Sequence, residues 1–109
     1  MGNMTLKEVC NEVGVSRRAI QGYEKLGLVQ ATGKMKRGYL LYDEDMILRI
    51  RTIKMYQNAG FQLKQIKGII DEPAEVRKAA LEGKITKLQK KKEELDETIE
   101  QIEAFLESL

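Results

Sequence analysis

Two short stretches near the start of the chain carry apolar residues at helical spacing. The apolar stripe of the first consists of Leu6, Val9, Cys10 and Val13. It opens on Thr5 and Glu8, which have the three-residue spacing of a capping box. After a Gly-containing turn that ends on Ser16, a second helix can run from Arg17 to Gly27. Two helices joined in this way predict a helix-turn-helix, whose second helix enters the major groove of DNA.

The helical period disappears after Val29. Gly33 and Gly38 bracket the basic run Lys34-Met35-Lys36-Arg37, and Tyr39 to Tyr42 suit a strand. We therefore predict a β-hairpin with a basic tip, whose cations and tyrosines suit phosphate and minor-groove contact. A solvated loop with ordinary surface lysines is the alternative. The position directly after a helix-turn-helix favours a wing that touches DNA.

Two further helices are predicted behind this wing. Asp43 can cap a helix from about Glu44 to Ala59, which Gly60 ends. Its inward stripe comprises Met46, Ile47, Ile50, Ile53 and Gln57. After Phe61 follows a shorter helix with the stripe Leu63, Ile66, Ile69 and Ile70. These helices supply the backing layer that a small domain over residues 1–70 needs for its core.

Residues 71–109 are predicted to form one long helix that starts near Pro73. Apolar positions alternate spacings of four and three along it, and the seam comprises Leu81, Ile85, Leu88, Lys92, Leu95, Ile99, Ile102, Leu106 and Leu109. This is the heptad pattern of a coiled coil. The alternative is an amphipathic helix folded onto its own domain, but the seam is narrow and long for so small a core. Pairing with a second copy of the chain is the favoured interpretation.

Local residues give conflicting signals about the orientation of this pair. Residues 77–92 contain seven basic residues and one acid, whereas residues 93–107 contain seven acids and no base. An antiparallel pair lays each basic half against an acidic half, and it places Lys92 beside a leucine of the second chain. A parallel pair instead matches Arg77 with Glu82 and Lys91 with Asp96 across the interface.

Charge divides the chain at the same place as the periodicity. The 19 basic and 17 acidic residues leave a net charge of only +2. Residues 1–70 nevertheless hold 12 Lys and Arg against 6 Asp and Glu, whereas residues 71–109 hold 7 against 11. This asymmetry indicates a DNA-facing domain followed by a segment with another role.

Several classes of site are excluded by composition. The chain has no histidine and one cysteine, so one subunit cannot assemble a zinc cluster or a Cys/His nucleophile. We expect no catalytic site, metal or cofactor, and we assign Cys10 to core packing. A single cysteine forms no internal disulfide, and no run of 18 apolar residues could span a membrane. A cytoplasmic protein without a membrane contact is the simplest expectation.

Several motifs in the first two thirds of the chain carry a family resemblance. They are Met4-Thr5-Leu6-Lys7-Glu8-Val9, Gly14-Val15-Ser16 with Arg18, Tyr23-Glu24-Lys25-Leu26-Gly27-Leu28, Gly38-Tyr39 with Tyr42, and Ala59-Gly60-Phe61 with Leu63 and Ile66. In this order and spacing, residues 4–70 resemble the DNA-binding domain of MerR-family transcriptional regulators. The resemblance implies a mostly α fold, with a winged helix-turn-helix domain followed by a long C-terminal coiled-coil helix. It also implies an antiparallel homodimer that binds a pseudo-palindromic promoter in double-stranded DNA, distorts it, and acts there with RNA polymerase.

The chain departs from the family pattern at two positions that usually carry a basic contact. Gln21-Gly22 stands where the family commonly has Arg-Tyr, and Leu40 stands where an arginine commonly follows Gly-Tyr in the wing. Arg17 and Arg37 are the nearest replacements.

The predicted DNA-binding residues are Ser16, Arg17, Arg18, Gln21, Tyr23, Lys34, Lys36, Arg37, Gly38, Tyr39 and Tyr42. Arg17, Arg18 and Gln21 are expected to read bases, and the basic wing residues to contact phosphate. Tyr23 is expected at the DNA backbone. Of Tyr39 and Tyr42, one should pack the wing onto the second helix and the other should touch DNA. The predicted dimerisation residues are Leu81, Ile85, Leu88, Lys92, Leu95, Ile99, Ile102 and Leu106.

Two other functions compete with a promoter-binding regulator. One is a non-regulatory DNA-binding module of similar fold, such as an excisionase-like or packaging recognition factor, although such factors rarely need a long dimerisation helix. The other is a coiled-coil adaptor whose basic head is incidental. Because the seam runs to Leu109, this form is expected to distort DNA without a small-molecule ligand.

Overall fold

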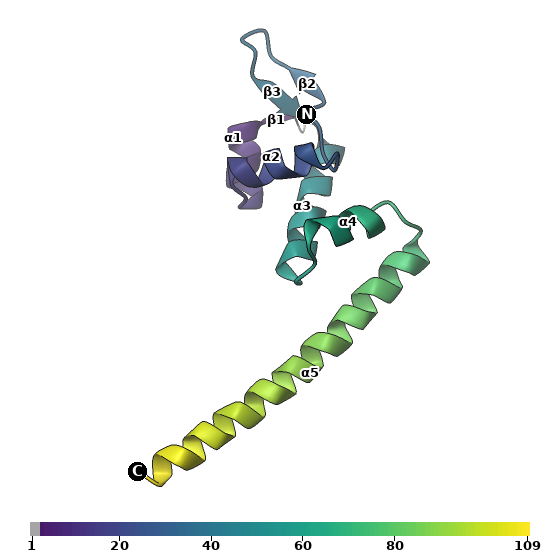
Figure 1. Ribbon diagram of the computed structural model, residues 1–109. Coiled ribbons are helices and arrows are strands. Elements are labelled where there is room, and N and C mark those ends of the chain that lie inside the picture. Colours follow the sequence, from purple (N-terminus) through teal and green to yellow (C-terminus); the bar gives the residue numbers. More distant parts are fainter. Residues whose placement is uncertain (1–2) are drawn as a thin grey trace. The chain divides into compact units, whose positions relative to one another are not determined.

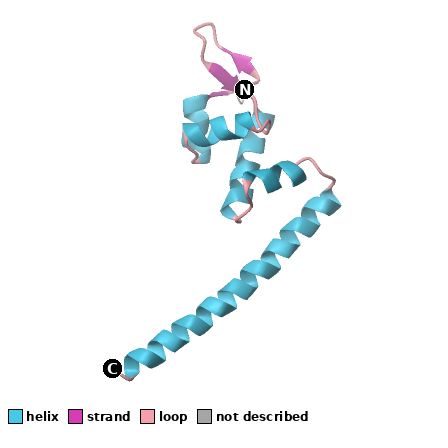
Figure 2. Ribbon diagram, in the orientation of Figure 1, coloured by secondary structure: helices cyan, strands magenta, loops and turns pink. Residues whose placement is uncertain are grey.

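The computed structural model describes residues 3–109 of a mostly helical chain with one small sheet (Figures 1 and 2). The elements in order are β1 (Met4–Thr5), α1 (Leu6–Val13), α2 (Arg17–Lys25), β2 (Gly33–Lys34), β3 (Leu40–Tyr42), α3 (Glu44–Asn58), α4 (Leu63–Ile69) and α5 (Ala74–Glu107). The chain forms two compact units, Met1–Asp71 and Glu72–Leu109. Met1 and Gly2, the first residues of the predicted domain 1–70, lie outside the described residues.

The helix-turn-helix forms through local capping, as predicted. The Thr5 hydroxyl accepts a hydrogen bond from the Glu8 N–H, and the Glu8 carboxylate accepts one from the Thr5 N–H. These bonds, led by the one from the Thr5 backbone, lower the pKa of Glu8. Helix α1 ends at Gly14 in the left-handed conformation, and the Ser16 hydroxyl accepts from the Ala19 N–H to begin α2.

The predicted hairpin is present, but it belongs to a three-stranded sheet. Strand β3 lies in the middle and pairs antiparallel with β1 and with β2, Tyr42 opposite Met4 and Leu40 opposite Lys34. The second hairpin strand begins at Leu40, one residue later than predicted. Strand β1 was not predicted because two residues are too short to show an alternating pattern. This third strand ties the base of the wing to the start of α1.

The core lies where α1, α2 and the sheet meet α3 and α4. Its fully buried side chains are Val9, Ile20, Tyr23, Tyr42, Ile50, Ile53 and Ile66. The inner face of α3 differs slightly from the predicted stripe, because Met46 and Gln57 are only half-buried whereas Tyr56 is buried. Tyr56 packs edge-on against Phe61, with ring centroids 5.4 Å apart.

Arg49 on α3 links two segments that are distant in sequence. Its Nε donates to the carbonyl of Leu28, just after α2, and its two terminal nitrogens donate to the Asp71 carboxylate at 2.7 and 3.0 Å. These bonds raise the pKa of Arg49 and lower that of Asp71, in each case chiefly through the Arg49–Asp71 hydrogen bond. Such a bidentate pair holds its partners in a defined geometry.

Helix α5 is an uninterrupted helix of 34 residues that Pro73 precedes as its N-cap. None of its residues, all of which the structure describes, is buried in the single chain. The apolar seam is therefore open: Leu81 is half-buried, the seam's apolar residues from Ile85 to Leu106 have exposed fractions from 47% at Leu88 to 63% at Leu95, and Leu109 is 86% exposed. Across residues 3–109, no helix is both long enough and apolar enough to cross a membrane.

Candidate nucleic-acid interface

Helix α2 presents its first turn to solvent and its other side to the core. Ile20 is fully buried, whereas Arg17, Arg18 and Gln21 are exposed, as the predicted i, i+1 and i+4 positions require. Ser16 caps this end, so the helix N-terminus and two guanidinium groups lie together. Both features attract phosphate, and the guanidinium fork can also donate two hydrogen bonds to a guanine edge.

The wing tip is a tight turn that displays its cations. The Met35 N–H donates to the Tyr39 carbonyl, and the Gly38 N–H donates to the Met35 carbonyl at 2.9 Å. Gly38 has φ +92°, a left-handed conformation that favours glycine, and this explains its place after the turn. The cations Lys34, Lys36 and Arg37 are all exposed. The role of Gly38 is therefore to allow the backbone turn at the wing tip.

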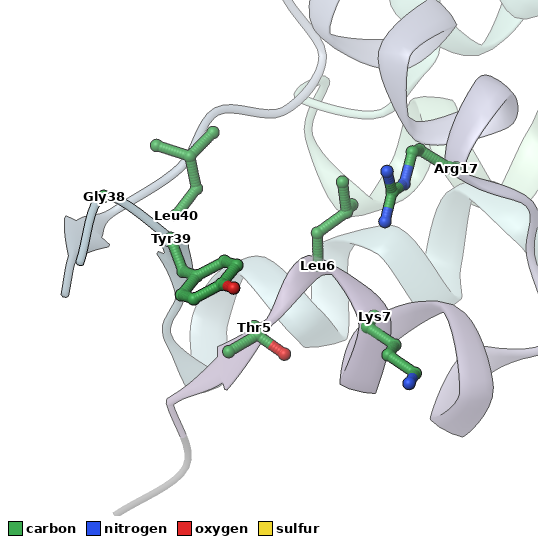
Figure 3. A pocket seen from close by; sticks show the side chains of 7 residues that line it. All are labelled: Thr5, Leu6, Lys7, Arg17, Gly38, Tyr39 and Leu40. Atoms are coloured by element: carbon green, nitrogen blue, oxygen red, sulfur yellow. The ribbon is translucent and has the colours of Figure 1, made fainter.

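A groove lies between the wing and the first turns of α1 and α2 (Figure 3). It has a volume of about 470 Å³ and is lined by Thr5, Leu6, Lys7, Arg17, Gly38, Tyr39 and Leu40. Lys7 was not predicted as a site residue. It lies two residues after the capping threonine, in the first turn of α1, and the pairing of β1 with β3 brings that turn to the groove.

Tyr23 does not lie where the sequence predicted. Its side chain is 1% exposed, and its hydroxyl donates to the side-chain oxygen of Gln57 on α3. The position three residues after Ile20 falls on the inner face of α2, so the ring enters the core. The predicted contact between Tyr23 and the DNA backbone is therefore wrong: the residue positions the recognition helix instead.

The two wing tyrosines divide as predicted, and the structure decides which is which. Tyr42 is 0% exposed and donates to the Glu24 carboxylate of α2 at 2.8 Å, so its predicted DNA contact is wrong. Tyr39 is 61% exposed and remains on the surface. Burial first, and then the hydrogen bond to Glu24, raises the pKa of Tyr42 well above its ordinary value of 10.0.

Tyr42→Phe should lower the free energy of unfolding by about 0.5–1.5 kcal/mol near neutral pH, because Glu24 loses its donor. The folded pKa of Tyr42 lies above the unfolded one, so the stabilisation is complete below about pH 10 and is lost as the pH rises further. The variant should therefore lose less stability on alkalinisation than the wild type. Urea unfolding at about pH 7.5 and about pH 10.5, at one protein concentration, measures both effects. Equal alkaline losses in the two proteins would contradict this role of the Tyr42 phenol.

Potential metal ligands do not gather at one place in residues 3–109. Cys10 is half-buried on α1, and no group of three or more potential ligands occurs among these described residues. The candidate nucleic-acid interface is the surface formed by α2, the wing and the groove.

Comparison with known proteins agrees with this geometry. The sequence profile of the MerR HTH family regulatory proteins matches residues 4–73, and a profile described as MerR, DNA binding matches residues 47–109. The HTH-type transcriptional activator mta of Bacillus subtilis is 35% identical over 104 residues, which are 95% of this chain and 40% of that protein. A probable heavy metal-dependent transcriptional regulator of Haemophilus influenzae is 29% identical over 106 residues, 97% of this chain and 82% of that one. The chain thus spans less than half the length of the first relative.

Two solved structures show the same fold. The N-terminal part of the Bacillus subtilis multidrug transporter activator, MtaN, superposes with a TM-score of 0.75 at 34% identity, over 94% of this chain and 97% of that one. HiNmlR, a MerR family regulator lacking the sensor domain and bound to promoter DNA, superposes with a TM-score of 0.72 at 21% identity, over 90% and 79%. At that identity, the second likeness concerns the fold alone.

Proposed function

The chain belongs to the MerR family of helix-turn-helix regulatory proteins, and from this premise we propose that it binds promoter DNA as a homodimer and regulates transcription there. The observation that carries the proposal is the exposed basic turn of α2 beside a basic wing, both held by one core. Family membership disfavours the excisionase-like module and the coiled-coil adaptor.

Within each subunit, α2 and the wing divide the work of recognition. Arg17, Arg18 and Gln21 enter the major groove and read base edges from the first turns of α2. The wing cations Lys34, Lys36 and Arg37 contact phosphate, which sets affinity and register without reading sequence. Ser16 caps the N-terminus of α2 by accepting from the Ala19 N–H, and its hydroxyl proton is left to donate to a phosphate oxygen.

The open seam of α5 is the surface through which two subunits pair. In an antiparallel pair that places Lys92 opposite Leu95, the other seam layers match Leu81 with Leu106, Ile85 with Ile102 and Leu88 with Ile99. All eight predicted dimerisation residues then face a seam residue. A parallel pair would stack Lys92 on its own copy in the seam. Together with the basic and acidic halves of the helix, this favours the antiparallel orientation.

The dimer acts by distorting a pseudo-palindromic promoter for RNA polymerase. Bending a site of this kind costs on the order of 1–6 kcal/mol, which the additional phosphate contacts of the two wings must offset. Leu40 in place of a wing arginine leaves one cation fewer for that purpose.

Selection of binding sites from a promoter library, followed by titration, tests the proposal. We expect a two-fold-related sequence bound by two subunits, with the logarithm of the affinity falling linearly with the logarithm of the salt concentration. End-to-end energy transfer across the selected site should report bending at saturating protein. Binding without sequence preference, or to straight DNA only, would refute regulation by promoter distortion.

Lys36→Ala and Arg37→Ala should each weaken binding to the selected site and to random DNA by the same factor. Each variant should also reduce the slope of the salt dependence by about one unit, because one counterion-releasing phosphate contact is lost. Lys25→Ala, at the far end of α2, is the matched control and should keep the wild-type slope. A loss confined to one operator base pair would show that the wing reads sequence.

A further inference from the structure

We propose that the groove between the wing and α1 binds the sugar-phosphate backbone of one DNA strand, with Lys7 as a phosphate-binding residue. This inference rests on the proposed function and assigns part of the DNA contact to α1, beyond the recognition helix and the wing tip.

The lining of the groove has the two chemistries that such a backbone needs. Lys7 and Arg17 are exposed cations on the α1 and α2 sides (Figure 3). The apolar part of the surface comes from Leu6, Tyr39 and Leu40, which contribute aliphatic groups and an aromatic ring. A deoxyribose offers a largely apolar face, and its two flanking phosphates each carry a charge. A groove lined by both cations and apolar groups therefore fits a sugar-phosphate backbone better than it fits an isolated anion or a base.

Apart from Arg17, which is proposed to read bases from α2, the groove offers few groups that suit recognition of base edges. Of the described residues that line it, none is acidic and none carries a side-chain amide, the groups that read adenine or cytosine. The Thr5 hydroxyl accepts the capping hydrogen bond from the Glu8 N–H at 3.3 Å and still has its own O–H to donate to a phosphate oxygen. Because Arg17 is assigned to base reading, Lys7 is the cation of the groove that is left for phosphate.

The groove is continuous with both surfaces of the proposed interface. Arg17 belongs to the first turn of α2, and Gly38 to Leu40 lead from the wing tip into β3. A DNA strand that contacts both α2 and the wing must pass over the groove between them. Pairing of β1 with β3 holds Thr5 beside Leu41, so the two walls are fixed by a backbone ladder. Lys7 thereby adds a cation to the groove that is also lined by Leu40, the position where the family pattern would place a wing arginine.

A scan of single neutral methylphosphonate linkages along the selected site tests Lys7. In the wild type, neutralising the phosphate that Lys7 contacts should weaken binding roughly threefold to tenfold. Lys7→Ala should weaken binding to unmodified DNA by the same factor and be insensitive to neutralisation at that one linkage. Lys25→Ala, the matched control, should keep the full penalty at every linkage. If every linkage costs Lys7→Ala as much as it costs the wild type, Lys7 contacts no phosphate and the inference fails.

Tyr39 variants test the apolar part of the groove. Tyr39→Phe should bind as the wild type does, whereas Tyr39→Ala should lose affinity for operator and random DNA alike, because the ring packs on sugar. Equal losses in both variants would assign the contact to the hydroxyl and overturn the packing. Lack of site-specific binding by the wild type would refute the proposed function itself, whereas normal wild-type binding with an uncoupled Lys7 would refute only this inference.

Discussion

Leu88→Asp should separate the subunits and remove binding to the operator. Leu88 lies in the middle of the α5 seam and is half-exposed in the single chain, and in the proposed dimer the second chain covers it. Each Asp would place an unpaired carboxylate in a dry interface, a change that typically costs about 3–5 kcal/mol. Every dimer carries two copies. A monomer would retain only one half-site's contacts and would lose the gain from linked binding.

Sedimentation equilibrium and operator titration together measure this effect. Ile99→Asp, which faces Leu88 of the second chain in the antiparallel pair, should behave in the same way. Ala104→Asp adds the same charge at an exposed position outside the seam and should remain dimeric and bind normally. If Leu88→Asp stays dimeric, the seam is not the subunit interface.

Arg18→Ala should weaken operator binding by about 1–3 kcal/mol, or roughly 5- to 150-fold, and broaden the sequence preference at one base pair. Arg18 is exposed on the first turn of α2, next to the helix N-terminus. A guanidinium in this place can donate two parallel hydrogen bonds to a guanine, and no smaller side chain replaces both.

The matched variant Arg18→Lys separates geometry from charge. Lysine keeps the positive charge but lacks the planar fork, so a base-reading Arg18 predicts loss of discrimination with a smaller loss of overall affinity. Competition titrations against operators with single base-pair changes report both quantities. Unchanged operator affinity in Arg18→Ala would remove Arg18 from the recognition surface.

Much of the fold could be predicted from the sequence because its signals are local. The Thr5–Glu8 capping box, the Ser16 cap and the Asp43 cap each depend on residues within one helical turn. The heptad spacing that predicts α5 is equally local, and it extends over more than three turns. Family motifs with fixed spacing added the expected roles of α2 and the wing.

The tyrosines show where local patterns are insufficient. Tyr23, Tyr39 and Tyr42 have the same side chain, whose ring suits the core and whose hydroxyl suits a surface. The two buried tyrosines each donate a hydrogen bond from the hydroxyl group to a side chain of another element: Tyr23 to Gln57 on α3, and Tyr42 to Glu24 on α2. The sequence placed Tyr23 at DNA and left open which of Tyr39 and Tyr42 packs the wing, whereas the structure buries both Tyr23 and Tyr42.

The sequence by itself determined the helices, their caps, the charge division and the open seam, since each follows from neighbours along the chain. Only the tertiary structure decided the third strand, the bonds from Arg49 to Leu28 and Asp71, and the groove that both Lys7 and Leu40 line. These features join residues more than 20 positions apart. These contacts depend on how the helices and the sheet pack against one another, and such long-range contacts produce no periodic pattern in the sequence.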